Sequence, residues 1–189
     1  MDVTQRNIRV LLVRENWANL AEYPLPRGCS IRWFAPGDEA VWGRIQAAAD
    51  HFNAITPDLF TRQFGSDRNA LGQRQCFLVD EGGAPIGTGT AWYNEDFQGK
   101  RYGRVHWIAL LPEFQGQGLA KPLMSVVCRR LQELGHERAY LTTSTARVPA
   151  LKLYRQFGFV PFIRSAYEAA LWRELDEVLE MGARGGLMD

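Results

Sequence analysis

A short glycine-containing loop between a branched, aromatic run and a helical pattern constrains the fold of this chain most strongly. Residues 104–111 read R-V-H-W-I-A-L-L, a composition that favours a buried strand. Beyond the loop, apolar side chains recur at helical spacing, at Leu119, Leu123, Val126, Val127 and Leu131. The sequence therefore predicts a strand that passes into a helix through residues 112–118.

The loop has the features of an anion site. Gly116 and Gly118 let the backbone turn its N–H groups towards one point, and the first turn of a helix adds a partial charge of about +0.5. Such a corner attracts phosphate. A Walker loop or a dinucleotide fingerprint that starts at Gly116 would need glycine at position 121, where the chain has Lys121. The alternative is a tight turn whose glycines only satisfy backbone geometry.

The six residues Gln115 to Ala120, Q-G-Q-G-L-A, follow the pattern Q-x-x-G-x-A. This pattern resembles the acyl-coenzyme A binding motif of the GNAT superfamily of N-acetyltransferases. A predicted strand over 138–143, a helix over 148–156 and an F-G-F turn follow in the order of that family, and the resemblance covers about residues 75–162. It implies a single α/β domain with a mixed, largely antiparallel twisted sheet flanked by helices.

The resemblance also implies acetyl-coenzyme A as co-substrate and no metal. The backbone of Leu110 and Leu111 would pair with the pantetheine arm of the coenzyme, and Thr143 would make a polar contact to the same arm. The pyrophosphate would lie against the loop, which comprises Gln115, Gly116, Gln117, Gly118, Leu119, Ala120 and Lys121. For Lys121, a solvated side chain is the alternative.

Acyl transfer to an amine requires a base for the ammonium proton and an acid for the departing thiolate. Tyr154 stands four residues before Gly158, where many GNAT enzymes have a tyrosine that reaches the coenzyme sulfur. A tyrosine with a pKa near 10 can donate a proton at neutral pH. We therefore expect Tyr154 to be the acid, and a tyrosine packed in the core is the alternative.

His106 is the candidate base, because a neutral imidazole with a pKa near 6.5 accepts a proton directly or through water. Strand alternation predicts His106 and Ile108 on one face and Trp107 on the other. Some GNAT enzymes carry histidine at this offset, whereas others use a glutamate two residues earlier, where this chain has Arg104. The base therefore stays open, and a histidine hydrogen-bonded within the sheet is the alternative. His136 follows a helix end, in a predicted surface turn.

The predicted function is N-acetyl transfer from acetyl-coenzyme A to an amine of a small molecule or peptide by direct attack. A catalytically silent coenzyme A binding or sensor module is the alternative. Cysteine nucleophile chemistry is disfavoured, because Cys128 falls in a predicted helix and Cys76 in a predicted strand, with no paired base evident.

Composition bounds the setting. A chain of 189 residues fits one domain, and 22 basic against 21 acidic residues give a net charge of +1, which predicts no nucleic-acid or membrane partner. Three cysteines without metal-type spacing and a start without an apolar core predict a cytoplasmic protein. No apolar run approaches the ~20 residues of a membrane helix.

We divide the chain into an N-terminal extension packed on the domain (1–28), the acetyltransferase-like domain (29–165) and a C-terminal amphipathic helix with a frayed tail (166–189). The C-terminal helix is predicted over 166–181 and packs on the domain, with a homodimer contact as the alternative. A polar loop is predicted over 94–103. The first helix opens at Asp38 with Phe52 on its inward face, and Thr56 caps a second one. Further strands are predicted over 8–13, 30–34, 75–79, 85–93 and 159–163.

Overall fold

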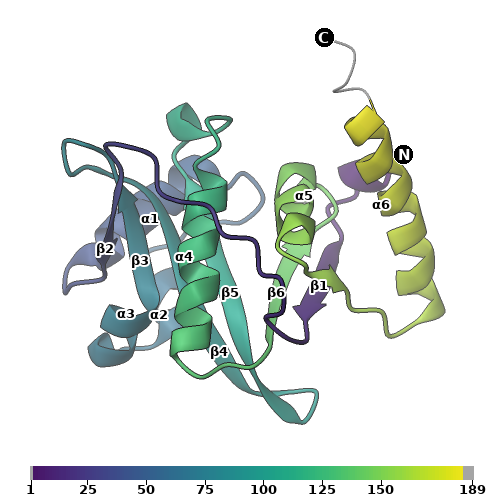
Figure 1. The fold of residues 1–189 in the computed structure, drawn as a ribbon, viewed down its shortest axis with the longest axis horizontal. Helices are drawn as coiled ribbons and strands as arrows, with labels where there is room; N and C mark the ends of the chain where they lie inside the picture. Colours follow the sequence, from purple (N-terminus) through teal and green to yellow (C-terminus); the bar gives the residue numbers. More distant parts are fainter. Residues whose placement is uncertain (1, 185–189) are drawn as a thin grey trace. The chain divides into compact units, whose positions relative to one another are not determined.

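The computed structural model describes residues 2–184, which form two compact units (Figure 1). The larger unit comprises residues 22–139, and the smaller one joins residues 2–21 to the part of the chain after residue 139. The strand, the loop and the helix that dominate the sequence all belong to the larger unit.

The larger unit is built on four antiparallel strands. They follow the order β2 (Ser30–Trp33), β3 (Gln75–Val79), β4 (Pro85–Phe97) and β5 (Lys100–Leu110). Every residue of β3 is buried. Burial selects an apolar run, and this run correctly predicted the strand over 75–79. The sheet thus has a fully buried strand beside the long pair that carries the loop.

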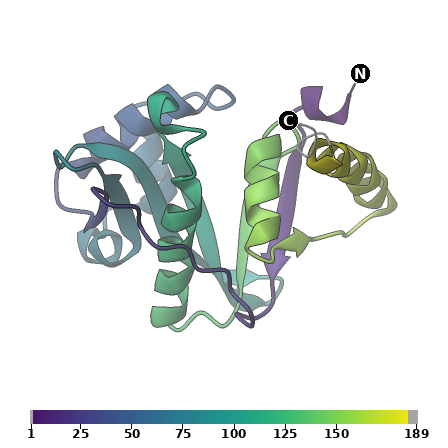
Figure 2. The ribbon, with the colours of Figure 1, turned by 45° about the horizontal axis from the view of Figure 1, so that its top comes forward.

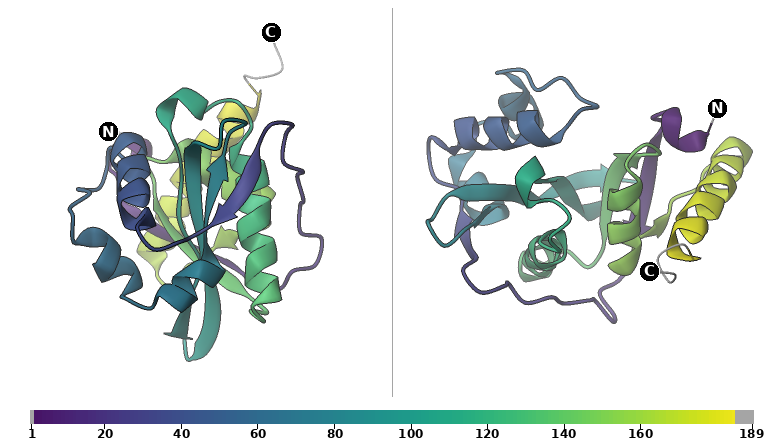
Figure 3. Two further views of the ribbon diagram at one scale, coloured as in Figure 1. Left: turned by 90° about the vertical axis from the view of Figure 1, so that its left-hand side faces the viewer. Right: turned by 90° about the horizontal axis from the view of Figure 1, so that it is seen from above.

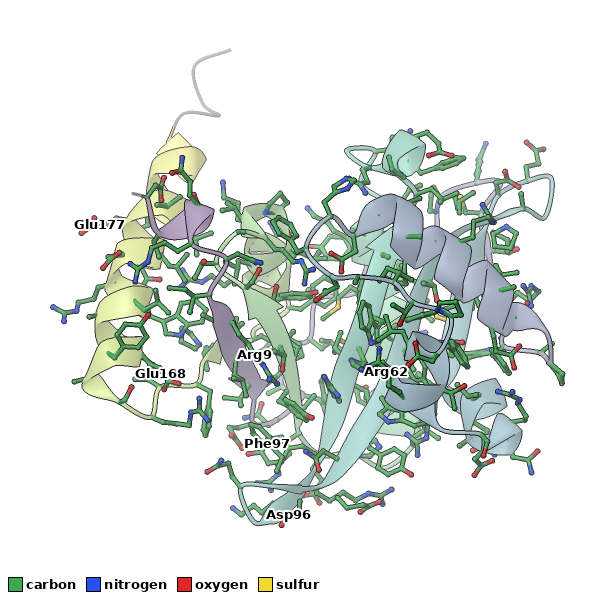
Figure 4. All side chains as sticks on the ribbon, turned by 180° about the vertical axis from the view of Figure 1, so that it is seen from behind. Arg9, Arg62, Asp96, Phe97, Glu168 and Glu177 are labelled. Carbon is green, nitrogen blue, oxygen red and sulfur yellow. The ribbon has the colours of Figure 1, made fainter. Side chains whose placement is uncertain are left out.

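β4 and β5 form a longer hairpin than the sequence predicted. The polar loop expected over 94–103 is wrong, because Phe97 pairs with Lys100 across a two-residue turn. That turn has φ of 57° at Gln98 and 74° at Gly99, as primed hairpin turns require. Figure 4 labels Asp96 and Phe97 at this end of the hairpin. The strands continue here with exposed polar residues, so the apolar pattern that marks a strand is absent.

Helices cover both faces of the four strands. α1 (Asp38–Ala49) and α2 (Leu59–Phe64) lie on one face and α4 (Ala120–Glu133) on the other (Figures 1 and 3). The short α3 (Arg68–Arg74) leads into β3. The core under α1 and α2 is rich in aromatic rings that meet edge to face, a favoured geometry. Its buried members are Phe34, Trp42, Ile45, Leu59, Phe60, Phe64, Leu71, Phe77, Val79 and Leu111.

α4 approaches the sheet closely at Gly89 of β4. A Cβ added there would come within 2.7 Å of Cδ1 of Ile108 and 2.9 Å of Cγ2 of Val127, closer than packed carbon atoms allow. The absent side chain at Gly89 therefore lets the helix lie against β4 and β5.

Two expectations about the helices of this unit are wrong, and one helix was not predicted. α1 ends at Ala49, and Phe52 is 47% exposed, because the Asp50 carboxylate accepts the backbone N–H of Phe52 at 2.8 Å and turns the chain out of the helix. α2 begins at Leu59, not directly after Thr56. The short α3 was not predicted; Asp67 caps it by accepting two backbone N–H groups.

The smaller unit contains the strands β6 (Ala139–Ser144), β1 (Arg9–Arg14) and β7 (Val160–Pro161), in that order. β1 and β7 are antiparallel, and β1 lies between α5 (Val148–Gln156) and α6 (Ala166–Arg184) (Figures 2 and 3). Short 3-10 turns, η1 (Val3–Gln5) and η2 (Pro112–Phe114), complete the elements of the two units.

α6 extends beyond its predicted end at residue 181, and the rest of the predicted tail, 185–189, lies outside the described residues. Its apolar face is covered, with Leu171, Trp172, Leu175 and Leu179 buried. The division into extension, domain and C-terminal segment stays a prediction. The predicted fold class is confirmed: a mixed, largely antiparallel α/β fold whose strands are flanked by helices.

Candidate functional site

The loop between β5 and α4 presents open backbone N–H groups. Gly116 and Gly118 have φ of 74° and 79°, a region that side chains rarely adopt. A Cβ added at either glycine would meet no atom within 4 Å. Within residues 2–184, no hydrogen bond uses the N–H groups of residues 116–118. The loop is thus a cradle of donors at the positive end of α4, and it fits an anion such as the pyrophosphate of coenzyme A.

Two glutamine side chains brace the loop. Gln115 donates its amide N–H to the carbonyl of Leu110 at 2.9 Å, and Gln117 donates to the carbonyl of Glu113 at 2.7 Å. Both side-chain amides are therefore engaged with backbone carbonyls at the loop, so the hydrogen bonds to an anion would come from the backbone N–H groups.

The last three residues of the predicted loop set differ in their surroundings. Leu119 is buried, so only its backbone is suited to a ligand. Ala120 begins α4. The ammonium of Lys121 lies 5.2 Å from the ring centre of Tyr23, within range of a cation–π contact. A phosphate contact by Lys121 stays a prediction.

The end of β5 offers backbone groups on one edge. Leu110 stands opposite Gly87 of β4, and the N–H of Leu111 donates to the carbonyl of Ile86 at 2.9 Å. In the alternating antiparallel pattern, the N–H and carbonyl of Leu110 then point away from β4, and the carbonyl already accepts from the side chain of Gln115. The Leu111 carbonyl accepts from Phe114 at 2.9 Å. The N–H of Leu110 is therefore better suited to pair with an extended ligand than either backbone group of Leu111, both of which are engaged.

His106 lies beside a β-bulge. The register of β4 against β5 shifts between Thr88 and Thr90, so that β5 has one additional residue there. Trp107 has φ of 51°, which changes the direction of the chain. Its carbonyl accepts a hydrogen bond from the side-chain amide of Gln46 on α1 at 3.0 Å, which satisfies a group that the bulge withdraws from the ladder.

The bulge makes the predicted strand alternation wrong at this point. His106 and Trp107 face the same side of the sheet. The ring of Phe64 on α2 lies 5.5 Å from that of His106, and the ring of Trp42 on α1 lies 5.3 Å from that of Trp107. Both side chains therefore belong to the layer under α1 and α2.

His106 is held as a neutral imidazole. It is 7% exposed, and Nε2 lies 3.0 Å from Oε1 of Gln63. Burial, and then the positive charge of Arg104, hold its pKa well below the ordinary value of 6.5. A neutral imidazole at pH 7 has the protonation state of a base.

The remaining predicted residues belong to the smaller unit. Thr143 is 5% exposed, and within the described chain its hydroxyl has no hydrogen-bond partner, as is also true of Thr142 and Ser144. Buried hydroxyls nearly always have partners, so this part of β6 is suited to a polar ligand. Tyr154 on α5 is largely buried, and its ring lies 6.5 Å from that of Phe159.

A sequence model of the acetyltransferase (GNAT) family matches residues 45–159. That range is more than half of the chain and includes the loop, His106, Thr143 and Tyr154. The chain belongs to the GNAT family. The resemblance inferred from the loop motif is thereby confirmed.

The chain is also similar to curated proteins of known name. The mycothiol acetyltransferase of Pseudarthrobacter chlorophenolicus is 34% identical over 162 residues, which cover 78% of this chain and 50% of that protein. The mycothiol acetyltransferase of Streptomyces coelicolor is 31% identical over 159 residues, which cover 82% and 50%. This GNAT chain therefore spans about half the length of the curated relatives it matches.

Solved structures show the same fold. A GCN5-related N-acetyltransferase from Sphaerobacter thermophilus has a TM-score of 0.65 at 21% identity, over 83% of this chain and 50% of that one. Glucosamine-6-phosphate N-acetyltransferase from Arabidopsis thaliana has a TM-score of 0.53 at 17% identity, over 72% and 95%. At these identities the likeness supports the GNAT fold and does not identify a substrate.

Sequence reasoning missed the two glutamines that contact β5 at the bulge, Gln46 and Gln63. A glutamine on an amphipathic helix ordinarily indicates a solvated face. Gln46 is 2% exposed. The one feature of the sequence that could have indicated its burial is its position next to Ile45, which was predicted to face inward. Gln63 directly precedes Phe64, which was expected to point inward. Neither position predicts contact with a bulge that the sequence does not reveal.

His136 is not in the exposed turn predicted for it. It is 4% exposed, and its Nε2 lies 3.3 Å from Nη1 of Arg74. Burial, and then the charges of Arg74 and Arg101, lower its pKa to about 4. Its neutral ring is a structural part of the larger unit.

Clusters of metal-ligating side chains and long apolar helices are absent from residues 2–184. Among the described residues, no group of three or more histidine, cysteine, aspartate or glutamate side chains could hold a metal ion. No helix of the described chain combines the length and the apolar character needed to cross a bilayer.

Proposed function

We propose that this chain transfers the acetyl group of acetyl-coenzyme A to a primary amine of a small molecule. One observation carries the proposal: the Gly116 to Gly118 loop at the start of α4 keeps its N–H groups unengaged within the described chain, in a chain of the GNAT family. The coenzyme would lie with its pyrophosphate on this loop and its pantetheine along Leu110. The buried Thr143 hydroxyl would be a further contact.

The chemistry proceeds by direct attack. The ammonium of the acceptor loses a proton to His106, and the free amine attacks the thioester carbonyl. The new C–N bond forms, the C–S bond breaks, and the nitrogen loses its second proton as the intermediate collapses. The thiolate gains a proton from the hydroxyl of Tyr154, and the second proton of the nitrogen restores that hydroxyl. His106 then releases its proton to solvent, so that the products are an amide, coenzyme A thiol and one released proton. His106 is neutral before the reaction, as a proton acceptor must be.

The acceptor is best sought among amines related to mycothiol. Two relatives at 34% and 31% identity are named mycothiol acetyltransferase, which supports a small-molecule acceptor over a peptide. A cytoplasmic setting is part of the proposal, supported by Cys29, Cys76 and Cys128, which form no disulfide within the described chain. A homodimer stays a proposal to be tested by sedimentation.

The first test is calorimetric titration of the purified protein with acetyl-coenzyme A and with coenzyme A. Turnover is then followed as thiol release against a panel of amines that includes deacetylated mycothiol, simple sugar amines and a peptide. Binding together with amine-dependent thiol release supports the proposal. Binding without turnover would favour the silent sensor module. No binding at millimolar ligand would overturn the coenzyme site.

Tyr154→Phe separates catalysis from binding. We expect kcat to fall by about 100-fold, because loss of a general acid typically costs that much, while the Kd of acetyl-coenzyme A stays unchanged. Tyr167→Phe is the matched control, since Tyr167 lies in the same unit and is 58% exposed. Unchanged kcat in a folded Tyr154→Phe protein would remove the tyrosine from the mechanism.

A further inference from the structure

The side chain of Gln63 meets two side chains of β5 at once. Its Oε1 lies 3.1 Å from the indole Nε1 of Trp107 and 3.0 Å from Nε2 of His106. The place of α2 can be found in Figure 4 from the label on Arg62, the neighbour of Gln63. Both β5 side chains reach this amide because the bulge turns Trp107 to the side of His106.

The indole determines the orientation of the amide. An indole nitrogen only donates hydrogen bonds, so the group that faces Trp107 is the oxygen of Gln63 and not its NH2 group. The same oxygen faces Nε2 of His106, and an amide oxygen only accepts. Nε2 therefore carries a proton. Since a neutral imidazole has one N–H group, its lone pair is on Nδ1.

The surroundings keep the imidazole in this form. The rings of Phe64 and Trp107 lie 5.5 Å and 5.9 Å from the ring of His106, and Arg104 is the charged group that acts on it. The positive charge and the burial both disfavour an imidazolium. Packing fixes the plane of the ring, and the bond to Gln63 fixes its proton.

We propose that Gln63 is a positioning residue for acetyl transfer: by accepting the Nε2 proton of His106, it fixes the tautomer in which Nδ1 receives the proton of the acceptor ammonium. This inference rests on the proposed function, in which His106 is the base. The proton passes from the ammonium nitrogen to Nδ1, and the Nε2–H bond to Gln63 remains intact throughout. Trp107 acts on His106 indirectly, because its indole N–H orients the side-chain amide of Gln63.

The tautomer is tested directly by NMR of the full chain with 15N-labelled histidine. The two ring nitrogens have distinct shifts, and coupling to the ring protons shows which one is protonated. His106→Gln assigns the signal. We expect a neutral ring with the proton on Nε2 at pH 7. A proton on Nδ1 would overturn the inference whether or not the protein is an enzyme.

Gln63→Glu tests the positioning role. A carboxylate still accepts from both Trp107 and His106, but it favours the imidazolium, so the pKa of His106 should rise by about 1 or more. The acid limb of the kcat/KM profile should move to higher pH by the same amount, with KM for acetyl-coenzyme A unchanged. Gln63→Met, which cannot accept the proton, should lower kcat by about tenfold or more.

Gln73→Glu is the matched control, because Gln73 is exposed on α3 of the same unit and undergoes the same change of charge. It should leave the acid limb in place. An acid limb that Gln63→Glu does not move, with the tautomer as expected, would make Gln63 a structural contact only. If the wild-type protein has no turnover, the proposed function fails, and the NMR tautomer and the NMR titration of Gln63→Glu still decide whether Gln63 sets the proton on His106.

Discussion

Gly118 is the residue at which the proposed coenzyme site can be tested most directly. Its φ of 79° is a conformation that side chains rarely adopt, and a Cβ added there would stand in open space at the loop. In Gly118→Asp a carboxylate would stand against the pyrophosphate, and we expect the affinity for acetyl-coenzyme A to fall by about 100-fold, since like charges near a protein surface repel by a few kcal/mol. Calorimetry measures the loss.

Gly99→Asp controls for backbone strain. Gly99 has φ of 74° and open space at its Cβ position, but it lies in the β4–β5 turn. Both variants should lose about 1–2 kcal/mol of stability, and only Gly118→Asp should lose affinity. Equal affinity for acetyl-coenzyme A in the two folded variants would show that the pyrophosphate does not bind at this loop.

The packing of α4 on the sheet can be tested at Gly89. In Gly89→Ala the new methyl group would meet Cδ1 of Ile108 and Cγ2 of Val127 at less than 3 Å, so we expect a loss of about 1–2 kcal/mol from overpacking. Gly43→Ala is the matched control. Gly43 lies inside α1 with no atom within 4 Å of an added Cβ, and the same substitution should stabilise by about 0.5–1 kcal/mol.

Urea denaturation at fixed pH gives both values. Opposite shifts of the midpoint would show that α4 approaches β4 as described. A Gly89→Ala protein as stable as Gly43→Ala would show instead that the helix has room for the methyl group.

Elements with a buried apolar pattern could be predicted from the sequence, and elements held by polar contacts could not. β3 over 75–79 and α5 over 148–156 have their predicted bounds, because burial on one or all sides selects their residues. The end of the β4–β5 hairpin was missed since its exposed strands carry polar side chains. At the bulge, the carbonyl of Trp107 accepts from the side-chain amide of Gln46, a contact between distant segments that no local pattern records.

In the candidate site too, local features could be predicted from the sequence and contacts between distant segments could not. The loop motif identified the GNAT family because it specifies backbone geometry, which neighbouring residues alone determine. The surroundings of His106 depend on α2, more than forty positions away along the chain, so the sequence predicted the histidine but not its partner. The roles of Thr143 and Tyr154 remain predictions of the resemblance.

The whole molecule should lose stability as the pH falls from 6.5 to 4.5. His136 has an ordinary pKa near 6.5 when the chain is unfolded and a pKa of about 4 when folded, and the pKa of His106 is lowered in the same direction. In this window the unfolded chain binds protons that the folded protein does not, so acid favours unfolding. A pKa difference of 1 between the folded and unfolded states corresponds to about 1.4 kcal/mol of stability, and with partial solvent screening His136 should contribute about 1–2 kcal/mol.

His136→Gln should therefore flatten the dependence of the urea midpoint on pH between 6.5 and 4.5, because glutamine does not titrate there. The pH dependence of the urea midpoint that remains in His136→Gln then reports on His106. Adding His106→Gln to that variant should remove a further part of the dependence. Identical slopes in the wild-type and His136→Gln proteins would mean that His136 is protonated in the folded state, and the buried contact with Arg74 would have to be abandoned.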